Sequence, residues 1–94
     1  MTTLFISAGL KLTENSDRAF ALEQLSTLVK ETNKESGCQY FEILANKEDP
    51  TAFTLWERWD SEEDLTAHFQ KAHTKTYLQF KLTDVLYIEK LQSI

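Results

Sequence analysis

The chain has 94 residues, of which 41% are hydrophobic and 27% are charged, so it has room for one small domain over residues 1–94. Its net charge of −5 comes without a cluster of Lys and Arg, which argues against a nucleic-acid or anionic-membrane surface because phosphates are neutralised by concentrated positive charge. A chain this short buries only a modest part of its surface alone. With nucleic acids and anionic membranes disfavoured, small molecules and other proteins remain as the expected partners.

The single cysteine and the N-terminal stretch indicate a compartment. Cys38 has no second cysteine to pair with, so an intramolecular disulfide and a cysteine zinc cage are excluded and a reducing environment is favoured. The first twelve residues (MTTLFISAGLKL) lack a basic region and a long apolar run, so they are not typical of a signal peptide or a membrane span. The expected location is the cytoplasm.

The first third of the chain predicts a strand followed by a long helix. Leu4–Leu10 is apolar and favours a strand, and the ENSD stretch at residues 14–17 is rich in helix-capping residues. From Ser16 onward, apolar residues recur at helical spacing with charged residues on the opposite face. Gly37 lies where the residue after a helix C-cap belongs. This pattern predicts an amphipathic helix that ends before Gly37.

The rest of the chain predicts a hairpin, a second helix and a last strand. Residues 38–45 (CQYFEILA) and 52–59 (AFTLWERW) are rich in aromatic and branched residues and flank a turn-forming stretch at 46–50. The SEED stretch at 61–64 resembles a capping box, so a helix is expected from Glu62. Residues 77–82 are a candidate short helix, and residues 85–91 (VLYIEKL) are the expected last strand.

This order is β-α-β-β-α-β, an α+β ferredoxin-like fold in which a four-stranded antiparallel sheet carries helices on one face. Alternate residues of a strand point to opposite faces, and in the first, second and last predicted strands both sets are apolar. A sheet with one wet face alternates with polar residues instead. We therefore expect a second copy to cover the free face, as in a symmetric homodimer.

Both histidines lie in one stretch, AHFQKAH at residues 67–73. His68 and His73 are five residues apart, roughly 140° around the axis of a single helix, and so differ from the i,i+4 pair that binds zinc. One unbroken helix cannot offer both rings to one metal, and no metal site is predicted. Generic alternatives are a buried His68 bonded to a backbone group and a His73 that ends the helix, where a cation favours the dipole.

Three pieces of the chain together resemble the antibiotic biosynthesis monooxygenase (ABM) family, from about residue 35 to residue 80. Residues 35–42 (ESGCQYFE) are similar to the family pattern E-P-G-C-x-x-Y-E, with Ser36 for proline and Phe41 for tyrosine. Residues 48–59 (EDPTAFTLWERW) are similar to E-D-P-x-x-F-x-L-Y-E-x-W, with Trp56 for tyrosine. Ser61, Leu65, His68 and His73 are similar to the S-x-x-x-L-x-x-H and later H of the following helix.

The resemblance implies a dimeric α+β barrel and an enzyme that needs no cofactor. The leading expectation is a monooxygenase of a small quinol or polyphenol bound in a cleft between sheet and helices. The family's other branches leave open an isomerase of a small phosphorylated hydroxyketone, and a non-catalytic small-molecule-binding dimer is the third alternative. A haem-degrading branch uses an asparagine in strand one, which the LFISAGLKL stretch lacks.

The resemblance and the helix-face positions select candidate site residues. The candidate catalytic residues are His68, His73 and Glu57, with His68 as the base, because a neutral imidazole can take a proton from a phenol or an enediol near pH 7. For Glu57 the competing interpretation is a structural ion pair among Glu42, Glu57 and Arg58, in which Arg58 supplies the positive charge. The residues expected to line the substrate pocket are aromatic: Trp59, Trp56, Phe69 and Tyr77. Both tryptophans are equally compatible with a core or a dimer interface.

Overall fold

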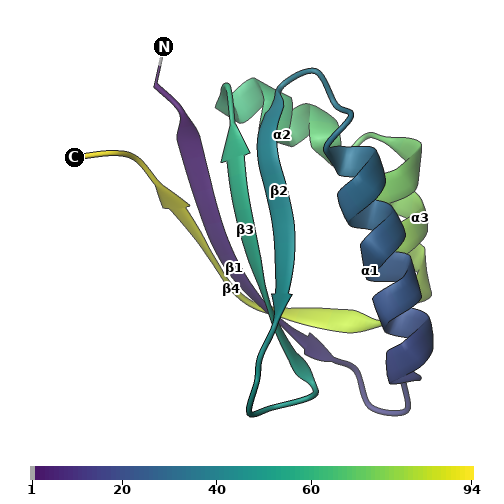
Figure 1. Cartoon of the computed structure of the whole chain (residues 1–94). Helices are drawn as coiled ribbons and strands as arrows, with labels where there is room; N and C mark the ends of the chain where they lie inside the picture. Colours follow the sequence, from purple (N-terminus) through teal and green to yellow (C-terminus); the bar gives the residue numbers. More distant parts are fainter. Residues whose placement is uncertain (1) are drawn as a thin grey trace.

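The computed structural model describes residues 2–94 and contains one four-stranded antiparallel sheet with helices packed on one face (Figure 1). The elements follow the chain as β1 (Leu4–Leu12), α1 (Arg18–Thr32), β2 (Cys38–Ala45), β3 (Ala52–Trp59), α2 (Glu62–His68), α3 (Ala72–Phe80) and β4 (Thr83–Leu91). The order of strands in the sheet is β2-β3-β1-β4. The predicted ferredoxin-like α+β fold is confirmed, and β4 forms one edge of the sheet.

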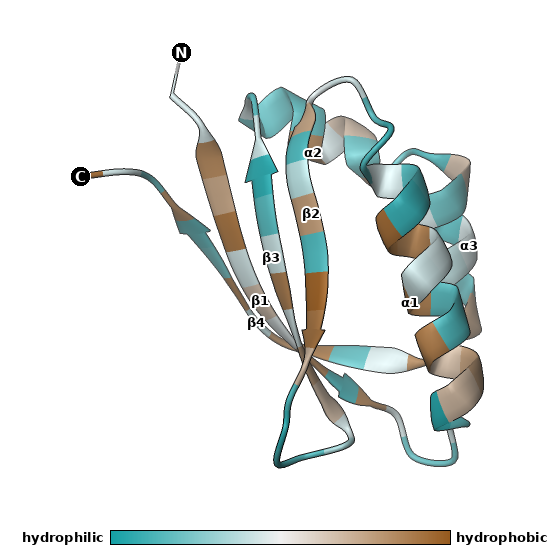
Figure 2. Ribbon diagram, viewed as in Figure 1, coloured by the Kyte–Doolittle hydropathy of each residue, from teal (hydrophilic) through white to brown (hydrophobic). Residues whose placement is uncertain are grey.

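The register of the strands decides which side chains face the helices. Ile6 pairs with Glu57, which in turn pairs with Phe41, so this row crosses β1, β3 and β2 on the helix side. The neighbouring row, Phe5 with Arg58 and Tyr40, lies on the opposite, outer face. Hydrophobic residues recur along β1 and β2 and on the side of α1 turned toward the sheet (Figure 2). The core therefore lies between the helix side of the sheet and α1, α2 and α3.

Capping explains where α1 begins and how its end is tied to the sheet. The Asp17 carboxylate accepts a hydrogen bond of 3.0 Å from the Ala19 amide, as an N-cap side chain does. At the other end, Asn33 is the C-cap, and its side chain bonds both the backbone carbonyl and the amide of Phe41 at 2.9 and 3.1 Å. These two hydrogen bonds to β2 fix the short turn that carries residues 34–37.

The predicted role of Gly37 as the residue after a helix cap is wrong. Helix α1 ends earlier than that role requires, and Gly37 has no positive φ; among the described residues only Asn15 and Lys81 adopt one. The glycine is instead required by packing, because a Cβ there would overlap the side chain of Asp64 in the first turn of α2. Asp64 accepts a 2.8 Å hydrogen bond from the Ser61 hydroxyl at the α2 N-cap, so close packing at Gly37 brings the two elements together.

The helical region after β3 consists of two helices, as expected, but the break between them lies earlier in the chain than the sequence pattern predicts. Helix α2 starts at Glu62 as expected but ends at His68, and α3 begins at Ala72 rather than near Tyr77. Between them the amide of Lys71 bonds the carbonyl of His68 in a turn. His73 therefore lies in the first turn of α3 and does not end a helix.

None of the helices in residues 2–94 has the length and apolar character needed to span a membrane.

Candidate functional site

A cavity of about 310 Å³ lies between the helix side of the sheet and helices α2 and α3. Its walls are mostly apolar and come from β1, β3, β4 and the two helices, with Ile6, Ala8, Leu10, Leu55, Leu65, Leu78, Val85 and Ile88 among the lining residues. Val85 and Ile88 are each 55% exposed, so the cavity meets solvent along the edge strand β4. Its size and apolar lining suit a small aromatic molecule.

His68 and Glu57 are buried side chains in the wall of this cavity, and both can exchange a proton near neutral pH. His68 is 4% exposed and Glu57 is 5% exposed. The His68 ring packs against Trp59 and Phe41, with ring centroids 5.1 and 5.6 Å apart. Two groups that can exchange protons thus share one apolar chamber, which is the arrangement expected of an acid/base site.

Glu35 holds the two histidines together. Its Oε2 atom lies 2.7 Å from Nδ1 of His68 and 2.7 Å from Nε2 of His73. The side chains of Glu35 and His68 are 6% and 5% exposed, while that of His73 is 20% exposed. An ionised carboxylate can accept a hydrogen bond from an N–H group of each ring, so the buried Glu35 has both histidines as hydrogen-bond partners.

This pairing orients His68 toward the cavity. Because Nδ1 of His68 faces Glu35, the proton belongs on Nδ1 and the lone pair on Nε2. No hydrogen bond reaches Nε2 from residues 2–94. Burial holds the pKa of His68 below its ordinary value, although the Glu35 carboxylate acts in the opposite direction. The ring is therefore neutral near pH 7 with a free basic nitrogen.

The three members of the Glu35 cluster come from separate elements. Glu35 lies in the turn between α1 and β2, where its amide bonds the Thr32 carbonyl and its carbonyl accepts from the Cys38 amide. His68 ends α2 and His73 starts α3. The premise that one continuous helix carries both histidines is wrong, because the break between α2 and α3 lets both rings reach one oxygen.

Glu57 has a different environment from Glu35. Its Oε1 atom accepts a 2.8 Å hydrogen bond from Nε1 of Trp59, two residues along β3 on the same face. Burial raises the pKa of Glu57 to about 7, with a smaller contribution in the same direction from the Glu35 charge. Glu57 has no ion pair with Arg58, because Arg58 points to the outer face of the sheet. Glu57 can hold or release a proton near neutral pH.

The predicted aromatic pocket residues are divided between different places. Phe69 and Tyr77 line the cavity, and the Tyr77 hydroxyl lies 2.6 Å from Oγ1 of Thr83. Trp59 is completely buried behind His68 and Glu57, where it supports both without lining the cavity. Trp56 lies on the outer face of the sheet, 36% exposed, and is not brought to the cavity.

Glu35 is the residue that the sequence reasoning missed. It opens the ESGC stretch that supports the family resemblance, but that stretch gives no reason to place its carboxylate against the histidines. The one local sign in the sequence is the position of Glu35, directly before the tight turn that leads into β2. A buried carboxylate requires partners, and the two histidines are the basic side chains that meet it.

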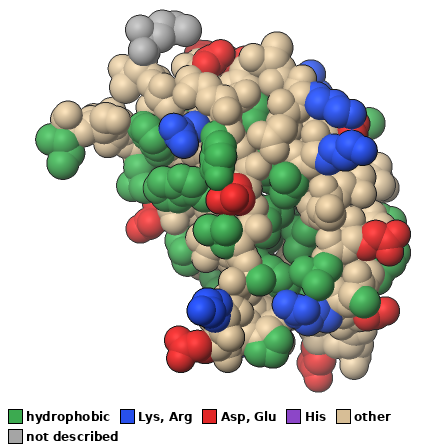
Figure 3. Space-filling view, viewed as in Figure 1, with side chains coloured by type: hydrophobic (Ala, Val, Ile, Leu, Met, Phe, Trp, Pro, Cys, Tyr) green, Lys and Arg blue, Asp and Glu red, His purple; other side chains and the backbone are tan. Residues whose placement is uncertain are grey.

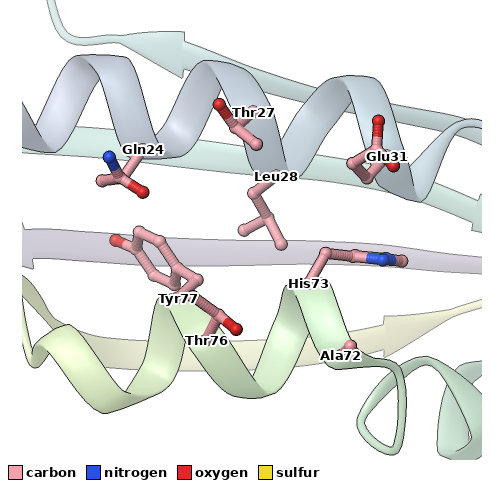
Figure 4. Close-up of a pocket in the computed structure, with 8 residues that line it drawn as sticks. All are labelled: Gln24, Thr27, Leu28, Glu31, Ala72, His73, Thr76 and Tyr77. Carbon is pink, nitrogen blue, oxygen red and sulfur yellow. The ribbon is translucent and has the colours of Figure 1, made fainter.

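A second hollow lies on the other side of His73. It is a groove of about 370 Å³ between α1 and α3, into which Leu28, Glu31 and His73 project (Figure 4). The cavity thus reaches the Glu35 cluster through His68 and the groove reaches it through His73, while Leu28 and Tyr77 line both hollows. The cavity is the better candidate for substrate, because it is mostly apolar and its wall holds the buried His68 and Glu57.

Comparison with known proteins finds one family over most of the chain. The family model described as antibiotic biosynthesis monooxygenase matches residues 5–79. A curated relative, protein YjcS of Bacillus subtilis strain 168, is 34% identical over 86 residues, which cover 92% of this chain and 82% of the relative.

Solved structures agree with this match. The structure of a protein YjcS has a TM-score of 0.91 at 31% identity and covers 99% of this chain and 100% of its own. A structure described as an antibiotic biosynthesis monooxygenase has a TM-score of 0.87 at 18% identity, with 97% and 98% covered. A Bacteroides thetaiotaomicron protein described as a possible oxidoreductase has a TM-score of 0.85 at 23% identity, with 98% of both chains covered. The last two show likeness of fold alone.

Proposed function

Because this chain belongs to the antibiotic biosynthesis monooxygenase family, we propose that it is a cofactor-independent monooxygenase of a small quinol or polyphenol. The observation that carries the proposal is the apolar cavity whose wall holds a free Nε2 of His68 beside the protonatable Glu57. The reaction requires a base, a dry chamber and orientation, since the electrons come from the substrate.

In the proposed reaction, Nε2 of His68 accepts a phenolic proton and the Glu35 carboxylate stabilises the resulting imidazolium. The phenolate gives one electron to O₂, and the substrate radical and superoxide then combine to form a carbon–oxygen bond. Cleavage of the oxygen–oxygen bond leaves one atom on the ring and releases the other as water, to which Glu57 supplies a proton. For a simple hydroquinone, one substrate and one O₂ give one hydroxyquinone and one water.

The lining of the cavity favours this substrate class over a phosphorylated hydroxyketone. Among the described residues that line the cavity, Lys90 is the one Lys or Arg. Its Nζ atom already lies 3.3 Å from the Glu62 carboxylate. Two carboxyl groups, Glu57 and Glu62, belong to the same lining. A phosphate dianion there would lose its hydration without gaining a free cationic partner, whereas an aromatic ring fits apolar walls.

Oxygen uptake tests the proposed activity. Purified protein is incubated with a panel of quinols and polyphenols under air and under anaerobic conditions, and uptake and product mass are followed. We expect protein-dependent uptake with one substrate class and a product that carries one atom from ¹⁸O₂. Product formed equally without oxygen indicates an isomerase, and an unchanged ligand bound in the cavity without uptake indicates a binding protein; either result contradicts the proposal.

We also propose that the outer face of the sheet forms a homodimer. Tyr87 and Leu91 on this face are 45% and 41% exposed, and hydrophobic side chains gather over the strands on the side away from the helices (Figure 3). Arg58 stacks over the rings of Tyr40 and Phe5 on the same face, at 5.0 and 6.0 Å. Its Nε atom is buried without a hydrogen-bond partner among residues 2–94, as expected where a second copy supplies the acceptor.

Truncation of the Trp56 side chain tests this interface. Trp56→Ala is expected to weaken the dimer roughly 30-fold, because a large aromatic ring at the centre of an interface contributes about 2 kcal/mol. Sedimentation over a concentration series measures the change. The matched control is Phe20→Ala, which removes an equally exposed ring from α1 on the other side of the molecule and leaves the dimer unchanged. A parent chain that sediments as a monomer at micromolar concentration contradicts the homodimer.

A further inference from the structure

We infer that Glu35, His68 and His73 form a binding site for a divalent first-row transition metal of the zinc class. Each residue offers one donor atom, and the three donor atoms lie within 4.8 Å of one another. Two imidazoles and one carboxylate are a donor set that binds such ions, and three protein ligands leave at least one position for water or another ligand.

The spacing of the donor atoms is close to that of a metal site. A metal with bonds of about 2.0 to 2.2 Å holds neighbouring donors roughly 3.0 to 3.4 Å apart. The Glu35 oxygen is 2.7 Å from each ring nitrogen, so it must withdraw by roughly half an ångström, which rotation about the flexible glutamate side chain allows.

The protonation of the cluster also suits metal binding. Metal ligation requires neutral imidazoles and an ionised carboxylate, and the proton that each neutral ring holds toward Glu35 moves to the other nitrogen of that ring when an ion takes its place. A divalent cation also compensates the charge of a carboxylate that is 6% exposed. The same three donor atoms can therefore either hydrogen-bond to one another or bind a metal ion.

The groove between α1 and α3 provides the route by which an ion arrives. His73 lines this groove and is the most exposed member of the cluster at 20%. Glu31 lines the same groove, with its carboxylate 3.0 Å from Nζ of Lys34, and supplies a further oxygen beside this route (Figure 4). An ion that enters here meets His73 before it meets the buried His68.

A metal bound at this site should affect the oxygenase reaction, a consequence that rests on the proposed function. A metal on Nδ1 of His68 fixes the ring proton on Nε2, the nitrogen that faces the cavity. The ring then has no basic lone pair to offer a phenol. Zinc is therefore an inhibitor of the oxygenase reaction that binds outside the substrate cavity.

Metal titration tests the site without any substrate. Metal-free dimer or monomer, as the chain exists in solution, is titrated with ZnCl₂ by calorimetry at neutral pH, and with CoCl₂ followed by its visible absorption. We expect one ion per chain with micromolar or tighter affinity. Glu35→Gln and His73→Ala are expected to weaken zinc binding by at least about 100-fold through loss of a ligand. The matched control is Glu48→Gln, which removes the same charge from the exposed β2–β3 turn and leaves affinity unchanged.

NMR of the unaltered protein guards against variants that fail to fold. Both imidazole rings should shift together and saturate at one zinc ion per chain. An affinity no tighter than millimolar, or an affinity that both ligand variants leave unchanged, would overturn the inference. Because the titration involves no quinol, its failure leaves the oxygenase proposal standing, and absent oxygen uptake leaves the metal site standing.

Discussion

His68→Asn is expected to lower oxygen uptake by roughly 10² to 10⁴, the usual scale for loss of a general base. The parent ring has its Nδ1 atom 2.7 Å from Glu35 and its Nε2 atom free. An asparagine amide at this position can still donate to Glu35, but it offers no basic nitrogen to the cavity. The variant therefore separates the catalytic role of the ring from its structural role.

Denaturation and turnover measured on the same samples make this separation visible. His68→Asn should unfold within about 1 kcal/mol of the parent, because the buried Glu35 carboxylate keeps a donor. His68→Ala removes that donor and should be less stable by about 1 to 3 kcal/mol. His73→Ala should lower turnover less than either, since His73 does not line the cavity. Full uptake by a folded His68→Asn protein excludes this ring as the base.

Glu57→Gln is expected to stabilise the protein at about pH 8 by about 3 kcal/mol and to leave its stability nearly unchanged at about pH 4. Burial raises the pKa of this carboxyl from 4.5 to about 7. Between these two values the folded chain keeps a proton that the unfolded chain has released, so stability falls as pH rises through the window. Above it, the folded protein carries the full cost of a buried charge, which a neutral amide avoids.

Urea denaturation at both pH values, at one fixed protein concentration, measures this difference. The glutamine oxygen can still accept the 2.8 Å hydrogen bond from Trp59, so the substitution changes charge with little change of contacts. Glu48→Gln is the control in the exposed turn and should show no such pH dependence. Equal stabilisation at both pH values contradicts the raised pKa.

The same variant bears on catalysis. An amide cannot supply a proton to departing water, so Glu57→Gln should lower oxygen uptake while it raises stability at about pH 8. A residue whose replacement stabilises the fold and weakens the reaction is one kept for function at a cost to stability. Unchanged uptake in the stabilised variant removes Glu57 from the proposed mechanism.

Much of the fold could be predicted from local patterns. The bounds of β2 and β3 and the first residue of α2 agree with the sequence, because aromatic and branched runs, a turn-forming stretch and a capping serine are local signals. The helix break at residues 69–71 carries no glycine or proline, so no local signal marked it. That break decides whether two histidines five residues apart can share a partner.

The sequence by itself determined the order of the strands and helices, the two-sided apolar character of the sheet and the alternation that puts Trp56 and Glu57 on opposite faces, since these follow from residue spacing within one element. Only the tertiary structure decided which of those faces meets the helices, and it alone brought Glu35 to the two histidines. The carboxylate is 33 and 38 residues away from them along the chain. A contact between elements depends on how the helices pack on the sheet, so no local pattern encodes it.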